Sequence, residues 1–154
     1  MFFETIKCED FEIFNLEYHQ KRVAKTIGKN FDLQEYINPP TNELLRCKIV
    51  YNKDEILSVD YFPYKIRDIK SFKIVVDNGL DYSKKYINRD KIDELFLKKD
   101  SCDEIIILKN GVVTDTSIAN IAIFYDGVWI TSKNCLLEGT SRARLIEKKE
   151  IFEK

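Results

Sequence analysis

The sequence lacks any long apolar run and any block of like charge. No apolar stretch approaches the roughly 18 residues that a membrane span needs. The opening MFFETIKCED meets an acidic residue at Glu4, too early for the apolar segment of a signal peptide. The 25 Lys and Arg residues nearly balance the 26 Asp and Glu residues, so nothing marks a surface for nucleic acid or an anionic membrane. These absences predict a soluble, cytoplasmic protein whose partners are small molecules or proteins.

Metal-binding motifs are also missing. The four cysteines, Cys8, Cys47, Cys102 and Cys135, are far apart, no Cys-x-x-Cys pair occurs, and the chain has a single histidine. Zinc sites draw on closely spaced cysteine and histidine ligands. We therefore expect reduced thiols and no metal site.

The first half of the chain alternates strand and helix signals. A short aromatic-rich strand, FFETIK, precedes a run with helical spacing between Asn15, a possible N-cap, and Gly28, a helix stop. Pro39 and Pro40 then interrupt regular structure. Three β-rich runs follow, LLRCKIVY, ILSVDYFPY and SFKIVV, and we predict that they form an antiparallel meander.

The second half begins after the polar segment DNGLDYSKK. NRDKIDELFLKKD has the spacing of a helix. EIIIL and VVT flank an Asn-Gly turn, and IANIAIFY and VWIT flank an Asp-Gly turn; both dipeptides are strong hairpin signals. The final segment, LLEGTSRARLIEKKEIFEK, predicts a helix that continues to the chain end. The 154 residues suffice for two small lobes, and we expect an α+β protein with a small lobe at 1–76, a linker at 77–83 and part of a larger lobe at 84–154.

Two adjacent lysines follow the predicted linker, in LDYSKKYINRD. Surface lysines are most often solvated charge. A lysine becomes a nucleophile when its ammonium is desolvated or lies near another positive charge, and for Lys85 that charge could come from Lys84 or Arg89.

Three other places offer complementary chemistry. Asp115 lies among the polar residues of TDTSIAN, where it could pair with a cationic ligand group or bond its own turn. Gly139, Thr140 and Ser141 open the last predicted helix, where amide groups and hydroxyls could bind phosphate or only cap the helix.

His19 and Arg22 share a helix face. The planar fork of arginine suits phosphate, and His19 is expected to be a hydrogen-bonded structural residue. A lysine, an acid, an arginine and a phosphate cradle are together the set of groups that binds pyridoxal phosphate.

The order and residue patterns of these motifs resemble those of the class IV aminotransferases, the fold-type IV pyridoxal phosphate enzymes. FFETIK with the H-x-x-R helix is similar to the family's opening, which gives Arg22 a phosphate contact. KYINR resembles the K-x-x-N-R Schiff-base segment of the lyase branch, which selects Lys85. GVVTDTSIANIAIF resembles the strand pair whose acid, here Asp115, meets the pyridine nitrogen. LLEGTSRA is similar to the L-x-G-x-T-R turn, which places Leu137 against the ring and Thr140 and Ser141 at the phosphate.

This resemblance implies a pyridoxal-phosphate enzyme with the cofactor between the two lobes. KYINR favours 4-amino-4-deoxychorismate lyase, which forms 4-aminobenzoate and pyruvate for folate synthesis. An aminotransferase acting on branched-chain or D-amino acids, or a non-catalytic binding module, are the alternatives. The family implies a small amino substrate and a homodimer. Relatives continue beyond the position of Lys154, so we expect the large lobe to be incomplete.

Overall fold

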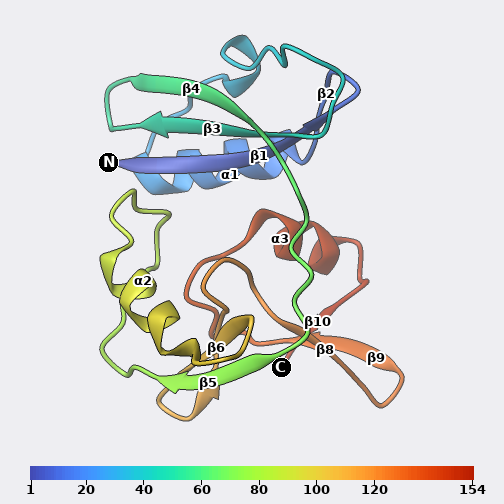
Figure 1. Ribbon diagram of the computed structural model, residues 1–154. Coiled ribbons are helices and arrows are strands. Elements are labelled where there is room, and N and C mark those ends of the chain that lie inside the picture. The colour runs from blue at the N-terminus through green and yellow to red at the C-terminus, as the bar shows by residue number, and fades with distance from the viewer. The chain divides into compact units, whose positions relative to one another are not determined.

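A four-stranded antiparallel sheet and one long helix make up most of the first of two units (Figure 1). The computed structural model describes residues 1–154. The first unit comprises residues 1–66 and 84–88, and the second comprises residues 67–83 and 89–154.

The chain passes between the units more than once. The sequence placed the lobes consecutively, at 1–76 and 84–154, with a linker between them. In the structure residues 67–83 belong to the second unit, and residues 84–88 return to the first. This return places the two adjacent lysines, Lys84 and Lys85, in the first unit.

The sheet of the first unit has the strand order β2-β1-β3-β4. Its strands are β1 (Phe2–Glu9), β2 (Glu12–Ile13), β3 (Leu45–Tyr51) and β4 (Ile56–Pro63). Alternate residues of a strand share a face, and Glu4, Ile6 and Cys8 of β1 are all fully buried. A carboxylate therefore belongs to the same buried row as two apolar side chains.

Helix α1 (Leu16–Ile27) supplies the other side of this core. Its Val23 packs in one cluster with Ile6 and Cys47 from the sheet. The helix ends as predicted at Gly28, which has a φ of 77° and donates its N–H to the carbonyl of Ala24 at 2.8 Å. A left-handed residue is the usual helix stop, and glycine adopts it without strain.

The run SFKIVV is not a third strand of this sheet, so that part of the predicted meander is wrong. It forms β5 (Phe72–Val76), which pairs in parallel with β6 (Glu104–Lys109) of the second unit. Parallel neighbours need a long crossover, and here that crossover contains α2 (Asp90–Phe96) and the 3₁₀ turn η2 (Leu97–Lys99).

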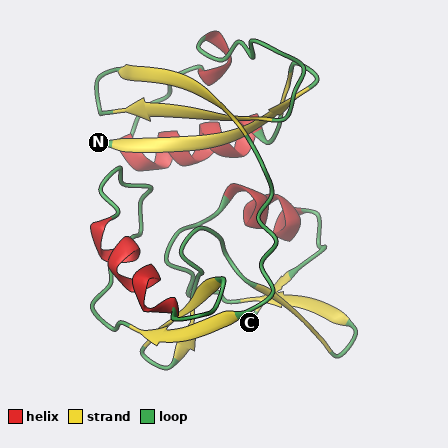
Figure 2. Ribbon diagram, viewed as in Figure 1, coloured by secondary structure: helices red, strands yellow, loops and turns green.

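Two predicted hairpins of the second unit are confirmed (Figure 2). One joins β6 to β7 (Val112–Val113) through Asn110 and Gly111, and the other joins β8 (Ala122–Tyr125) to β9 (Val128–Thr131) through Asp126 and Gly127. All four turn residues have φ between 50° and 80°, the backbone that a two-residue hairpin of this kind requires.

The last helix is shorter than the sequence predicted. Helix α3 (Thr140–Glu147) ends before Lys149, whose φ of 58° turns the chain. Phe152 then lies in β10 (Phe152–Glu153), which pairs in parallel with β9. Arg142 of α3 holds this strand through an ion pair with Glu153 at 2.5 Å.

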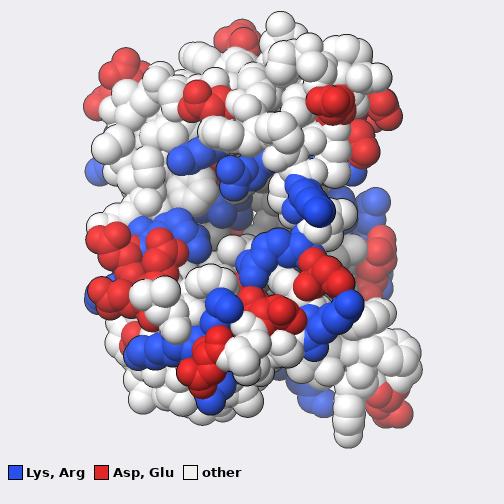
Figure 3. All heavy atoms as spheres, in the orientation of Figure 1, with Lys and Arg blue, Asp and Glu red and all other residues white.

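Charged side chains of both signs are interspersed on the face of the second unit in Figure 3. Lys73 and Asp100, for example, form an exposed ion pair at 2.9 Å; such surface pairs add little stability. The longest helix, α1, has 12 residues, and none of the helices has the length and apolar character of a membrane span.

Candidate active site

The lysine pair lies on a segment that runs beside the start of β1. The N–H of Phe3 donates to the carbonyl of Lys85 at 3.0 Å, and the N–H of Ile87 donates to the carbonyl of Met1 at 3.2 Å. Phe2 and Tyr86 face each other as an antiparallel bridge. The backbone of Lys85 is therefore fixed to the sheet rather than left on a loose linker.

The two lysines have different surroundings. The ammonium of Lys84 donates to the carbonyl of Thr26 at 3.0 Å, in the last turn of α1. A positive charge there is favourable, because a helix C-terminus carries partial negative charge. The ammonium of Lys85 lies 4.7 Å from the ring centroid of Phe3. Lys84 thus bonds the end of α1 and is not simply solvated, which was one of the two interpretations of this residue; the other was a charge that acts on Lys85.

Glu4 organises the polar centre of the first unit. Its side chain is fully buried, and it accepts hydrogen bonds from His19 Nδ1 at 2.6 Å and from Arg22 Nε at 2.9 Å. A second contact joins Arg22 Nη2 to the other carboxylate oxygen. Burial alone would raise the pKa of Glu4, but hydrogen bonds and charge from His19 and Arg22 outweigh it, so this pKa lies below its ordinary value.

His19 acts in this cluster as a neutral donor. Burial lowers its pKa, and the charges of Arg22 and Lys85 lower it further, against the opposing effect of Glu4. Because an ionised carboxylate only accepts, Nδ1 carries the proton. The expectation that His19 is a hydrogen-bonded structural residue agrees with this position. Arg22 and Lys85 lie in the same unit, and the charge of each lowers the pKa of His19.

Asp115 is the centre of the second unit's polar cluster. One carboxylate oxygen accepts from the N–H of Leu136 at 3.1 Å and from Asn120 Nδ2 at 3.2 Å, and the other accepts from the N–H of Leu137 at 3.2 Å. Within its own turn it is bonded by the side chain of Asn120 and not by a backbone N–H, the alternative that the sequence left open. Burial raises its pKa and outweighs these hydrogen bonds and the charge of Arg142.

Asp115 differs from the other buried acids in lacking a cationic partner. Glu4 pairs with Arg22, and Glu104 pairs with Arg67 at 2.9 Å. Asp115 is also buried, with only 7% of its surface exposed, but it forms no ion pair. A buried carboxylate is costly when it forms no ion pair, and the charge of Arg142 does not offset the burial of Asp115. The site therefore fits a ligand that presents a cationic N–H, as a protonated pyridine does.

The remaining predicted residues follow Asp115 in the same unit. Leu137 is tied to Asp115 by its N–H and to Asn120 by its carbonyl, which accepts from Nδ2 at 2.8 Å. Thr140 and Ser141 form the first turn of α3, after the extended residue Gly139. The N-terminal end of a helix favours anions.

One candidate named from the sequence, Arg89, belongs to the other unit, and one residue, Glu4, was missed. Arg89 donates to the carbonyl of Ser117 at 2.8 Å, within the second unit. Glu4 was not selected, because a glutamate in a short strand is usually exposed. Its alternation with Ile6 and Cys8 was the available signal that it faces the core.

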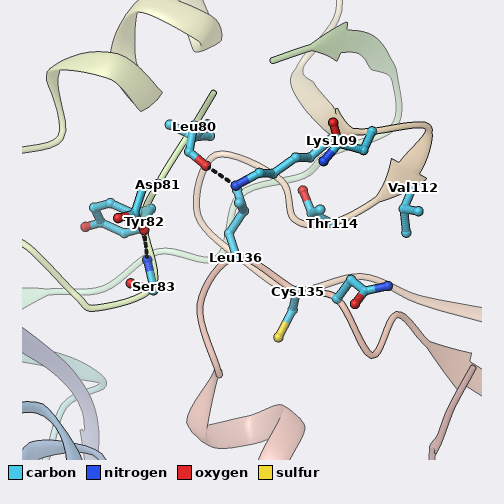
Figure 4. Close-up of a pocket in the computed structure, with 11 residues that line it drawn as sticks. Leu80, Asp81, Tyr82, Ser83, Lys109, Val112, Thr114, Cys135 and Leu136 are labelled. Atoms are coloured by element: carbon cyan, nitrogen blue, oxygen red, sulfur yellow. Dashed lines mark hydrogen bonds between the residues drawn. The ribbon is translucent and has the colours of Figure 1, made fainter. Parts of the chain in front are cut away.

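A cavity of about 450 Å³ borders the loop that holds Asp115 (Figure 4). Lys109 reaches across it and donates to the carbonyl of Leu80 at 2.6 Å. Thr114 precedes Asp115 in the chain, and Leu136, also in the wall, bonds its carboxylate. A change in this wall therefore acts on Asp115 through its nearest backbone neighbours.

Comparison with known proteins places this arrangement in a family. A family model described as amino-transferase class IV matches residues 78–152. An uncharacterised protein of Haemophilus influenzae is 37% identical, in an alignment covering 99% of this chain and 86% of that protein. A crystal structure from Haemophilus somnus, provisionally named a 4-amino-4-deoxychorismate lyase, is 36% identical with a TM-score of 0.93 and is matched over 86% of its chain.

More distant structures share the fold. The PLP-bound form of a hypothetical aminotransferase from Mycobacterium tuberculosis has a TM-score of 0.74 at 16% identity, with 99% of this chain and 70% of that chain covered. The predicted mixed α and β fold of the fold-type IV enzymes is confirmed. The chain belongs to the class IV aminotransferase family.

Proposed function

We propose that this protein is a pyridoxal-phosphate-dependent 4-amino-4-deoxychorismate lyase, which converts its substrate to 4-aminobenzoate and pyruvate. The observation that carries the proposal is the carboxylate of Asp115, buried, bound by two backbone amides and without a cationic partner. The similarity to the Haemophilus somnus protein supports the choice of lyase. The proposed substrate is a small amino compound.

Six residues would hold the cofactor. Lys85 would bind its aldehyde carbon and Asp115 its ring nitrogen. Leu137 would contact the ring, and Arg22, Thr140 and Ser141 would bind its phosphate. The bound cofactor supplies an electron sink for charge that develops on the substrate.

Lys85 has two tasks in this scheme. It would hold the cofactor, and its free amine would take the ring proton of the substrate. The ring C–O bond to the enolpyruvyl group would then break, and the ring would become aromatic, which drives the step forward. The enolate released would take up one proton, equivalent to the one that Lys85 removed, and so become pyruvate. The attachment of Lys85 to β1 limits where this amine can move.

Asp115 and Arg22 have fixed electrostatic tasks. A carboxylate beside the ring nitrogen favours the protonated nitrogen and so keeps the ring electron-poor. The guanidinium of Arg22 presents a planar set of donors suited to phosphate. Glu4 holds one edge of that guanidinium, the edge formed by Nε and Nη2.

The two adjacent lysines give a matched test of the cofactor site. The protein is mixed with pyridoxal phosphate, reduced with borohydride and digested, and the modified peptide is identified by mass spectrometry. We expect the label on Lys85. It should persist in Lys84→Ala and disappear in Lys85→Ala. Labelling of Lys84, or no visible absorption from bound cofactor, would contradict the proposal and favour a non-catalytic binding module.

The reaction is tested separately from the cofactor. Wild-type protein loaded with pyridoxal phosphate is incubated with 4-amino-4-deoxychorismate, and 4-aminobenzoate and pyruvate are measured. We expect both products in equal amounts, and none with Lys85→Ala. Formation of glutamate from 2-oxoglutarate and a branched-chain or D-amino acid, without 4-aminobenzoate, would instead assign an aminotransferase. Size-exclusion chromatography with light scattering tests the proposed homodimer.

A further inference from the structure

Asn120 forms three hydrogen bonds that join separate parts of the second unit. Its Nδ2 group donates to the Asp115 carboxylate at 3.2 Å and to the carbonyl of Leu137 at 2.8 Å. Its Oδ1 accepts from the N–H of Gly139 at 3.1 Å. One side-chain amide thus contacts the carboxylate of Asp115, the loop at Leu137 and Gly139, the residue that precedes α3.

The contact with Gly139 leaves no room for a larger residue. A Cβ atom at position 139 would lie 2.0 Å from Asn120 Oδ1. The φ of Gly139 is −70°, which any residue adopts. A side chain at position 139 would therefore displace the amide of Asn120, whereas the backbone conformation would accept it.

We propose that Asn120 is a positioning residue that fixes the Asp115 carboxylate and the first turn of α3 in one arrangement. This inference rests on the proposed function, in which Asp115 binds the ring nitrogen of pyridoxal phosphate and Thr140 and Ser141 bind its phosphate. The aromatic ring is rigid and its phosphate arm is short. The two groups of the protein must therefore keep a fixed separation to bind both ends at once.

Asn120→Asp tests this link with little change of shape. The new carboxylate keeps an acceptor for Gly139, but it replaces the donor that faces Asp115 and the Leu137 carbonyl. Two acceptors then repel each other at both contacts, and the negative charge lies beside Asp115. The other charge acting on Asp115 is that of Arg142, which is paired with Glu153.

The first measurement uses the protein without cofactor. Carboxyl ¹³C NMR follows the titration of Asp115, and we expect a higher pKa in Asn120→Asp than in wild type, because a like charge disfavours ionisation. An unchanged pKa would overturn the proposal. Thermal unfolding followed by circular dichroism establishes that the variant is folded.

The second measurement compares pyridoxal phosphate with pyridoxal, which lacks the phosphate. In Asn120→Asp we expect the affinity for pyridoxal phosphate to fall by about tenfold or more. We expect a smaller loss for pyridoxal, because Asn120 also holds the turn that binds phosphate. Equal losses for the two ligands would overturn the link to α3 and leave Asn120 as a partner of Asp115 alone.

Asn78→Asp is a matched control. The Asn78 Oδ1 accepts from the N–H of Asn110 at 2.8 Å on the exposed surface of the same unit, so aspartate keeps that contact and adds the same charge. We expect affinities within about twofold of wild type, since exposed charges are screened. A loss as large as that of Asn120→Asp would show a general charge effect and overturn the proposal.

Gly139→Ala provides an uncharged second variant. Its methyl group must displace Asn120, so we expect the affinity for pyridoxal phosphate to fall in the same direction while the protein stays folded. Unchanged affinity and an unchanged Asp115 pKa in this folded variant would contradict the inference. If wild-type protein fails to bind pyridoxal phosphate, the proposed function fails, and the titration of Asp115 without cofactor still decides whether Asn120 positions it.

Discussion

Arg22 and Glu4 form a two-point ion pair inside the first unit, with Arg22 Nε 2.9 Å from one carboxylate oxygen and Nη2 on the other. The Glu4 side chain is 0% exposed and that of Arg22 is 12% exposed. The pairing fixes the plane of the guanidinium before any ligand arrives. It also means that neither charge can be removed without leaving the other buried.

Glu4→Gln should therefore destabilise the protein strongly. Gln keeps the shape and one acceptor but leaves Arg22 without a counter-charge, and breaking a buried pair in this way costs about 3 kcal/mol. The free energy of unfolding, measured in urea, should fall by that amount. Arg22 should then leave its fixed position, and affinity for pyridoxal phosphate should fall as well.

Glu104→Gln serves as the control for this prediction. Glu104 is also fully buried, but its partner Arg67 has 43% of its side chain exposed and can return to water when the pair is broken. We expect a smaller loss, about 1–2 kcal/mol, and no specific loss of affinity for phosphate. Equal destabilisation by the two variants would show that burial of the arginine is not the deciding factor.

Acid should destabilise the first unit in two stages. The pKa of His19 is lowered from 6.5 and that of Glu4 from 4.5. A depressed pKa contributes stability above the unfolded value and loses it as pH falls through the folded value. Stability should thus decline from about pH 6.5 as the unfolded chain protonates its histidine, and further below the ordinary pKa of Glu4.

The single histidine makes this prediction directly measurable. NMR signals of the imidazole should titrate below pH 6.5 in the folded protein and near that value in urea. Glu4 raises the pKa of His19, so Glu4→Gln should lower this pKa further. A folded pKa above the unfolded one would contradict the assignment of a neutral His19.

The four cysteines should differ in reactivity toward iodoacetamide. Burial, with the nearby charge of Cys8, raises the pKa of Cys47 to about 12, and burial also raises the pKa of Cys8. Because the thiolate is the reactive form, neither should be alkylated at pH 8 in folded protein. Cys102 and Cys135 are both partly exposed, but burial raises the pKa of Cys135, so Cys102 should react first. Mass spectrometry of the digested protein reads each site, and modification of Cys47 before unfolding would contradict the prediction.

Much of the local structure could be predicted because its signals are local. The Asn-Gly and Asp-Gly turns, and the glycine that ends α1, each act through a few neighbouring residues. The run at 72–76 could not be assigned to its sheet in this way. Its apolar pattern fits either sheet, and only the distant partner β6 decides the pairing.

The candidate site residues were chosen from signals of the same local kind. Lys85 and Asp115 were selected by chemical type and by the order of motifs along the chain, and the structure gives each a defined environment. The role of Lys84 was not predictable, because Thr26 is far from it in sequence and meets it only after residues 84–88 return to the first unit. The burial of Glu4 could be inferred from its alternation with Ile6 and Cys8, but its pairing with His19 and Arg22 on α1 could not.

Lys84 should matter for stability but not for chemistry. Lys84→Met keeps the aliphatic stem and removes the ammonium that bonds the Thr26 carbonyl at the end of α1. The loss of one charged hydrogen bond and of a favourable charge at a helix C-terminus should cost about 1 kcal/mol. Urea unfolding of the cofactor-free protein measures this cost, while borohydride labelling of Lys85 in the same variant should match wild type. If Lys84→Met unfolds at the same urea concentration as wild type but Lys85 is no longer labelled, Lys84 acts on the chemistry of Lys85. A purely structural role predicts lower stability and unchanged labelling.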